Sequence, residues 1–151
     1  MKLLTKNTDY AVRALLHLSR NGHGFISSRE ISREERIPLP YLRRILQKLR
    51  EEDLITAREG AGGGVKMNRE PGDIRLNHLI EIFQGRMTLL DCVFRGEICF
   101  NVKTCPLRRR IKKIENTVTE ELEGVTIASL LDDIKEITDE KNDSKDRRRT
   151  L

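Results

Sequence analysis

The chain has 151 residues, of which 37% are hydrophobic and 35% are charged, a composition typical of a soluble, helix-rich protein. Its apolar runs are all shorter than the roughly 20 residues that a membrane-spanning helix needs, and its N-terminus turns polar too soon for a signal peptide. The sequence therefore predicts a cytoplasmic protein without a membrane partner. This length suffices for a hydrophobic core without disulfide bonds and favours one domain with an appendage.

The net charge of +5 comes from the first half of the chain. Residues 1–70 carry 14 Lys and Arg against 9 Asp and Glu, whereas residues 71–151 carry 15 of each kind. This asymmetry favours a polyanion as the partner of the N-terminal part. A solvated basic surface would have the same composition, so the charge alone does not identify the partner.

Three predicted helices open the chain. The first covers residues 5–22, with Thr5 as its cap and Gly22 at its end. A short second helix is capped by Ser27 or Ser28, and a third follows two prolines in residues 38–54. The third helix has an apolar stripe at helical spacing, made of Leu42, Ile45, Leu46 and Leu49. Basic residues lie outside this stripe.

A glycine-rich hairpin is expected next. Residues 54–68 read LITAREGAGGGVKMN, which are two short strand-like runs around EGAGGG. A phosphate-cradling loop would need a helix directly after the glycines, whereas a second strand follows here. Helix, short helix, basic helix and hairpin are the order of a winged helix-turn-helix, whose third helix enters the major groove of DNA. The expected fold is mainly α with a small β wing.

The second half of the chain predicts a dimerisation helix. A helix within residues 71–85 is followed by a long one that starts at Pro106. The long helix has an apolar stripe of coiled-coil spacing, made of Leu107, Ile111, Ile114, Val118 and Leu122. Its other faces are charged, so the stripe needs a partner, and a second copy would also suit a palindromic DNA site. Thr126 is expected to cap a last short helix.

The predicted organisation has four parts. They are a winged helix-turn-helix domain over residues 1–85, a cysteine segment over 86–105, a dimerisation helix with a short C-terminal helix over 106–137, and a tail over 138–151. The tail has almost no apolar residues to bury and is expected to be disordered.

All three cysteines, Cys92, Cys99 and Cys105, lie in the segment CVFRGEICFNVKTC. In a reducing cytosol, clustered cysteines indicate metal, cluster or redox chemistry sooner than a structural disulfide. Thiolates are the soft ligands of iron–sulfur clusters, and Gly96 allows the segment to turn around one. Zinc favours closely paired ligands such as C-x-x-C, which this segment lacks, and a metal-free thiol–disulfide switch is a further alternative.

The order of these motifs resembles the IscR/NsrR (Rrf2) family of winged-helix transcription regulators. The resemblance covers about residues 1–135 and rests on TDYAVRALLHL, IPLPYLRRILQKL, GAGGG and the three cysteines, the last followed by PLR. It implies that Cys92, Cys99 and Cys105 bind an iron–sulfur cluster, 4Fe–4S sooner than 2Fe–2S. It also implies a homodimer that binds double-stranded DNA, often as a repressor, with an affinity that the cluster sets.

Three cysteines leave one position of such a cluster to a fourth ligand. Some members of the family use a His three residues after the last cysteine, where this chain has Arg108. Others use an Asp in the first helix of the partner subunit, and the matching residue is Asp9. The helix dipole alone also favours a carboxylate in the first turn, so both interpretations stay open. His17, His23 and His78 are far from the cysteines in sequence and are more simply surface or core residues.

The DNA-contacting residues are expected on three elements. They are Ser27 and Ser28 at the second helix, Tyr41, Arg43, Arg44 and Lys48 on the third, and Arg58 and Lys66 in the wing. Arginine can pair with guanine or bind phosphate, and a solvated face would also carry Arg43 and Arg44. Many members of the family place an arginine directly before the first wing glycine, where this chain has Glu59. Arg58 or Lys66 can substitute for it.

The leading hypothesis is a regulator, expected to repress transcription, whose cluster senses nitric oxide, oxygen, redox state or iron supply. An enzyme would need acid–base or nucleophilic residues at coherent spacing, and the sequence has no such set. A cluster-free repressor with a thiol switch or a zinc ion is the alternative.

Overall fold

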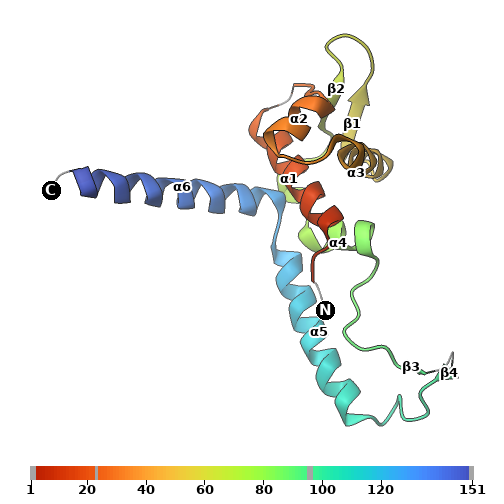
Figure 1. Cartoon of the computed structure of the whole chain (residues 1–151). Coiled ribbons are helices and arrows are strands. Elements are labelled where there is room, and N and C mark those ends of the chain that lie inside the picture. Colours follow the sequence, from red (N-terminus) through yellow and green to blue (C-terminus); the bar gives the residue numbers. More distant parts are fainter. Residues whose placement is uncertain (1–2, 23, 95–96, 150–151) are drawn as a thin grey trace.

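The computed structural model describes residues 3–22, 24–94 and 97–149, so the expectations for His23 and Gly96 lie outside the described residues. In chain order the elements are α1 (Lys6–Arg20), α2 (Ser28–Glu34), α3 (Leu39–Glu51), β1 (Ile55–Arg58), β2 (Gly64–Met67), the 3-10 helix η1 (Pro71–Asp73), α4 (Leu76–Gln84), β3 (Val93–Phe94), β4 (Glu97–Ile98), α5 (Pro106–Gly124) and α6 (Ile127–Arg149). Figure 1 shows α1 to α4 and the β1–β2 hairpin gathered at one end, with α5 and α6 extending away from them. The predicted fold class, mainly α with a small β wing, is confirmed.

One hydrophobic core joins the first three helices to the wing. The predicted stripe of α3 is buried along its whole length, and α1 packs against it with Ala11, Ala14, Leu15 and Leu18. The two alanines of α1 allow close approach of the helices, and each fully buried leucine contributes about 1.5–3 kcal/mol to folding. This core fixes the orientation of α3, so that its opposite face meets solvent.

The boundaries of α2, α3, α4 and α6 follow the predicted caps, whereas Thr5 precedes α1 without a side-chain capping bond and α1 ends at Arg20, two residues before Gly22. The Ser27 hydroxyl accepts a hydrogen bond from the Glu30 amide at 3.2 Å, which makes Ser27 the N-cap of α2. Pro38 directly precedes α3. Gly85 ends α4 with a positive φ of 78°, and Thr126 accepts a hydrogen bond from the Ser129 amide at 3.1 Å at the start of α6.

The wing is a two-stranded antiparallel sheet to which a third segment is attached. Ile55 pairs with Met67, and Arg58 pairs with Gly64. Ile26 joins the far side of β2 through two hydrogen bonds of 2.9 Å with Val65, one in each direction. The loop before α2 is therefore hydrogen-bonded to the wing.

The chain after α5 returns to the winged domain, which the sequence did not predict. The Leu76 amide donates to the Val125 carbonyl at 2.8 Å, and the Ile127 amide donates to the Ile74 carbonyl at 3.0 Å. Ile127 is 1% exposed and belongs to the same core as α1 and α3. Helix α6 consequently starts on the winged domain and packs against α1.

Helix α6 is longer than predicted. The sequence suggested a short helix and a disordered tail over residues 138–151, whereas the structure continues a single helix to Arg149. The segment TDEKNDSKDRRR has no Pro or Gly, and five of its twelve residues are Lys or Arg, which have good helix propensity. Low hydrophobicity removes the reason to pack against another element, but it does not prevent a solvated helix.

Candidate nucleic-acid interface and cysteine site

The solvent face of α3 carries the predicted DNA-contacting residues. Tyr41 is 56% exposed, and Arg43 and Arg44 are exposed beside it. Neither arginine forms an ion pair or a side-chain hydrogen bond within the described parts of the chain. Both guanidinium groups are therefore available to a polyanion.

Lys48 differs from these arginines because it forms ion pairs with two acidic residues at the C-terminal end of α3. Its Nζ lies 3.3 Å from a carboxylate oxygen of Glu52 and 3.9 Å from one of Glu51. A phosphate would have to compete with two carboxylates for this ammonium group. We therefore rank Lys48 below Arg43 and Arg44 as a DNA contact.

The α2 serines have different environments. The Ser27 hydroxyl is occupied as the cap acceptor, while Ser28 is the first residue of α2 and is half-buried. A capping hydroxyl keeps its own hydrogen for donation to an external acceptor. Ser27 can thus act both as the helix cap and as a donor to a phosphate.

The wing cations gather around an aromatic ring that sequence reasoning did not single out. The Cζ of Arg58 lies 4.3 Å from the ring centroid of Phe25, and the Nζ of Lys66 lies 5.1 Å from it. Arg58 also donates a hydrogen bond from Nη2 to the Gly62 carbonyl at 2.8 Å. The exposed carboxylate of Glu59 follows Arg58 directly.

The three cysteines lie on a small hairpin and at the start of α5. The Cys99 amide donates to the Cys92 carbonyl at 2.8 Å, so these two residues flank the β3–β4 hairpin. Cys105 is the N-cap of α5, and its Sγ accepts from the Arg108 amide at 3.4 Å. All three are half-buried and none forms a disulfide.

The donor set suits an iron–sulfur cluster in its chemistry. Three free thiols on one short segment are soft ligands, and one of them, Cys105, lies at the N-terminus of the 19-residue helix α5. Within residues 3–22, 24–94 and 97–149, however, no three side chains of His, Cys, Asp or Glu are grouped as a metal site. The segment therefore supplies suitable ligands that this conformation does not gather.

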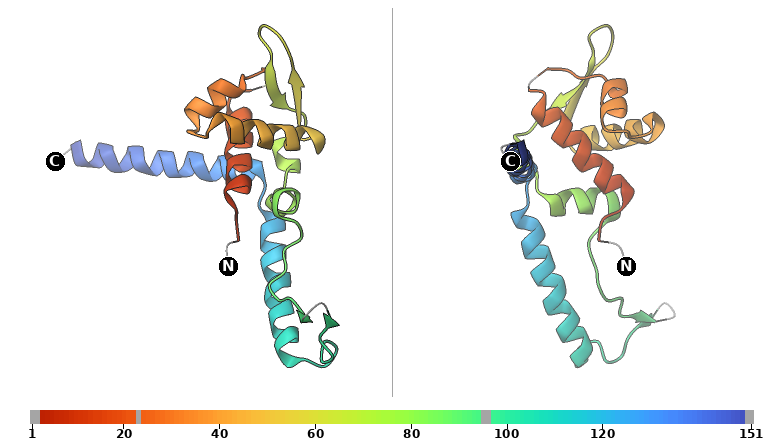
Figure 2. Two further views of the ribbon diagram at one scale, coloured as in Figure 1. Left: turned by 45° about the vertical axis from the view of Figure 1, so that its right-hand side comes forward. Right: turned by 60° about the vertical axis from the view of Figure 1, so that its left-hand side comes forward.

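Asp9 lies on α1, away from the cysteines. Helix α1 and the β3–β4 hairpin are separate in all views of the molecule (Figures 1 and 2). The Asp9 carboxylate is exposed and forms an ion pair of 3.8 Å with Arg13, one helical turn away. Arg13 also lies 3.6 Å from the Glu35 carboxylate, whose other oxygen is 3.0 Å from Nδ1 of the buried His17. Within this chain Asp9 thus lies on the surface of α1 and pairs with Arg13 rather than with the cysteines.

The other histidine expectations can be compared directly with the structure. His17 is a buried core residue and His78 is exposed on α4, so neither lies with the cysteines.

Glu115 is a buried acid that sequence reasoning missed. It lies on α5, where it accepts a hydrogen bond from the Leu89 amide at 3.0 Å and pairs with the Lys112 ammonium group. The hydrogen bond from Lys112 and that from Leu89 lower the pKa of this carboxyl group, while burial opposes them. Glu115 ties the chain that leads to Cys92 onto α5. The signal in the sequence is its position beside the predicted apolar stripe, since Glu115 follows Ile114 directly and lies four residues after Ile111.

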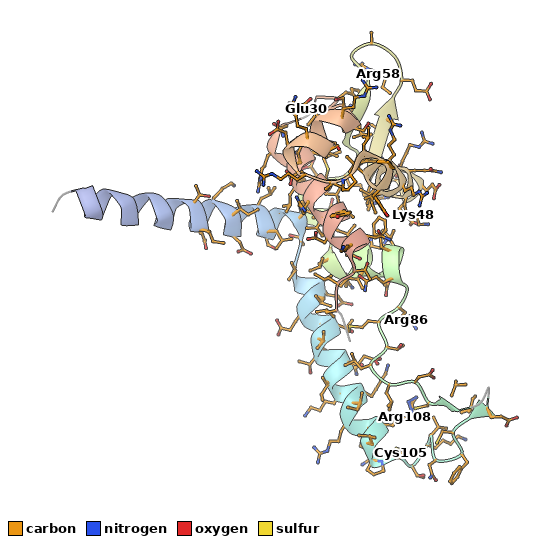
Figure 3. The ribbon with its side chains drawn as sticks, in the orientation of Figure 1. Glu30, Lys48, Arg58, Arg86, Cys105 and Arg108 are labelled. Carbon is orange, nitrogen blue, oxygen red and sulfur yellow. The ribbon has the colours of Figure 1, made fainter. Side chains whose placement is uncertain are left out.

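The arrangement as a whole defines a winged helix-turn-helix DNA-binding protein. A short helix leads to a basic helix, a glycine-tipped wing follows, and Figure 3 shows Lys48 and Arg58 at the same end of the molecule, far from Cys105 and Arg108. Among the described residues, no helix is long and apolar enough to cross a membrane.

The chain belongs to the Rrf2 family, described as iron-dependent transcriptional regulators, which matches residues 4–133. It is 33% identical over 129 residues to protein aau3 of Rhizobium meliloti (strain 1021), covering 85% of this chain and 84% of that protein. It is 26% identical over 136 residues to the regulator NsrR of Oceanobacillus iheyensis, covering 89% of this chain and 92% of that protein. Among solved structures, T. potens IscR superposes with a TM-score of 0.70 at 25% identity, covering 91% of this chain and 90% of that one. The chain is therefore a transcription regulator of a DNA-binding family and not an enzyme.

Proposed function

We propose that the protein is a homodimeric repressor whose affinity for a palindromic operator is set by an iron–sulfur cluster, 4Fe–4S in preference to 2Fe–2S. Cys92, Cys99 and Cys105 would hold the cluster, and Asp9 of the partner subunit would supply the fourth ligand. When bound, the cluster supplies a centre that reacts with nitric oxide or oxygen or responds to iron supply. The observation that carries this proposal is the position of three free thiols between the DNA-binding domain and α5.

The coupling of thiols to DNA binding is supported by the way α5 joins the two ends of the molecule. Cys105 caps the start of α5, and the chain after its end enters the core of the winged domain at Ile127. A change at the cysteine segment therefore reaches the reading domain through one helix.

A dimer is supported by the apolar stripe of α5. Leu107 and Ile114 are 59% and 52% exposed, although they lie in the predicted coiled-coil spacing. We expect Ile114→Glu to produce a monomer in analytical ultracentrifugation, because it places a charge in the stripe. The control Thr117→Glu changes an exposed position of the same helix and should leave the mass unchanged. A wild-type monomer at micromolar concentration would contradict the dimer.

Anaerobic purification tests the cluster. We expect a brown protein containing iron and sulfide, and loss of its visible absorbance in Cys92→Ala, Cys99→Ala and Cys105→Ala. Asp9→Ala should change the spectrum or accelerate cluster loss, while Asp133→Ala, which removes an exposed acid of α6, should not. A colourless protein without iron would overturn the cluster, and unaltered spectra in Asp9→Ala would exclude that ligand.

A metal-free thiol switch is the second candidate, because the described cysteines are not grouped as a metal site. It requires that two thiols form a disulfide and change DNA affinity without any metal. Metal analysis together with thiol titration before and after oxidation separates the two: iron in the anaerobic protein supports the first function, whereas metal-free protein with reversible loss of two thiols supports the second.

A further inference from the structure

Phe25 lies where the loop before α2 meets the wing. Its neighbour Ile26 is hydrogen-bonded in both directions to Val65, which fixes the backbone beside the ring against β2. The ring is half-buried, and two wing cations lie within 4.3 and 5.1 Å of its centroid. The negative face of an aromatic ring attracts cations at such distances.

The strand register brings the two cations to this ring. Arg58 pairs with Gly64, and Lys66 lies two residues further along β2, so both side chains project from the same face of the hairpin. Gly64 allows the loop segment to come this close, because a Cβ there would lie 2.3 Å from the Ile26 carbonyl oxygen. The cluster of Phe25, Arg58 and Lys66 is thus a product of the wing geometry.

Arg58 is held in one orientation. One of its terminal nitrogens donates to the Gly62 carbonyl at 2.8 Å, and its Cζ lies over the Phe25 ring, 4.3 Å from the centroid. A guanidinium group has five donors in its plane, so stacking on a ring leaves its edge open to a bidentate acceptor such as phosphate. Holding the side chain in advance lowers the entropy that it loses on binding.

The charge around this cluster favours the DNA backbone over base edges. Glu59 is exposed next to Arg58, and its carboxylate opposes insertion of this part of the wing into the electronegative minor groove. Two cations beside one ring match a phosphate instead. Such a contact adds affinity without reading sequence.

We propose that Phe25 is a positioning residue for DNA binding, which holds Arg58 and Lys66 as a pre-organised contact to a backbone phosphate. This inference rests on DNA binding by the winged domain. It assigns to Phe25 a role that neither the charge pattern nor the reading helix indicates.

The test uses a random-sequence DNA duplex, since a backbone contact needs no operator. Fluorescence anisotropy at several KCl concentrations gives the affinity and its salt slope. We expect Phe25→Leu to weaken binding about threefold to tenfold, while Phe25→Tyr, which keeps the ring, binds as the wild type does. Arg58→Ala should lower the salt slope by about 0.9 for each phosphate contact that is lost.

A double-mutant cycle distinguishes positioning from general support of the fold. If Phe25 acts through Arg58, Phe25→Leu should weaken DNA binding much less in the Arg58→Ala background than in the wild type. Additive losses, an unchanged affinity in Phe25→Leu, or an unchanged slope in Arg58→Ala would each overturn the inference. If Phe25→Leu does not fold, an unchanged Arg58→Ala slope still rejects the phosphate contact for which Phe25 is proposed to position Arg58. A wild-type protein without any DNA affinity would instead overturn the DNA-binding function and the inference with it.

Discussion

At the scale of single residues, the ion pairs decide which basic side chains are available. Arg43, Arg44 and Lys48 look equivalent in sequence, but Lys48 lies within 4 Å of two carboxylates. Its helix neighbours therefore reduce the potential that a phosphate would meet.

We expect Arg43→Ala and Arg44→Ala each to weaken DNA binding by about 1–3 kcal/mol, because an arginine that contacts a base or phosphate directly is lost. Lys48→Ala should cost clearly less, since it also releases Glu51 and Glu52 from their partner. Titration of each variant with the same duplex at one salt concentration measures the difference. Equal losses in all three would contradict the assignment.

A second residue-scale prediction concerns Glu115. Its pKa is lowered from the ordinary value of 4.5, first by the hydrogen bond from Lys112 and then by that from Leu89. A carboxyl group with a lowered pKa in the folded state stabilises the fold above its unfolded pKa, and this contribution is lost as the pH falls through the folded pKa. We therefore expect Glu115→Gln to be less stable than wild type at pH 7, with the difference shrinking below about pH 4.5.

Urea unfolding of the apoprotein between pH 7 and pH 3 measures this effect. Glu121→Gln, which removes an exposed acid of the same helix, serves as the control. It should leave the free energy of unfolding unchanged at every pH. A constant difference between wild type and Glu115→Gln over the whole range would show that the carboxylate charge is not responsible.

At the scale of elements, the wing depends on close backbone approach. Gly64 has a φ of 151°, and a Cβ there would lie 2.3 Å from the carbonyl oxygen of Ile26. The bridge between Ile26 and Val65 therefore requires glycine at this position.

Gly64→Ala should destabilise the protein by about 1–3 kcal/mol, because both the backbone conformation and the bridge are disturbed. Gly72→Ala is the matched control, since its nearest neighbour would be the Ala128 Cβ at 4.0 Å and its φ is not in the positive range that favours glycine. Thermal unfolding of both variants, with hydrogen exchange of the Val65 amide, measures the effect. Equal unfolding midpoints for the two variants would contradict the claim that the Ile26–Val65 bridge requires glycine at position 64.

At the scale of the whole molecule, α5 and α6 connect distant regions. Helix α5 carries the cysteine segment at one end, and Ile127 at the start of α6 closes the core at the other. The DNA-binding domain is therefore completed by a residue from the C-terminal part of the chain.

Ile127→Ala should lower the free energy of unfolding by about 2–5 kcal/mol, as expected for a fully buried isoleucine. Ile137→Ala, on the same helix but 52% exposed, should change it by less than about 0.5 kcal/mol. Chemical denaturation of both variants gives the comparison. A small effect of Ile127→Ala would mean that the winged domain folds without α6.

The sequence alone determined the local elements of this protein, because caps, apolar periodicity and glycines act over a few residues. Ser27, Pro38 and Gly85 ended or started helices where expected, and the stripe of α3 proved to be buried throughout. The cysteine segment and the basic helix were visible for the same reason, since each is a run of neighbouring residues.

Only the tertiary structure decided which distant residues meet. It brought Ile127 into the first core, Glu115 to the Leu89 amide, and Phe25 to Arg58 and Lys66. These partners are separated by 26 to more than 100 residues, or depend on the register of one hairpin and the loop beside it. Hydrophobic periodicity does not predict such contacts, because it describes single helices and strands. The packing of these elements and the pairing of the strands determine which distant residues meet.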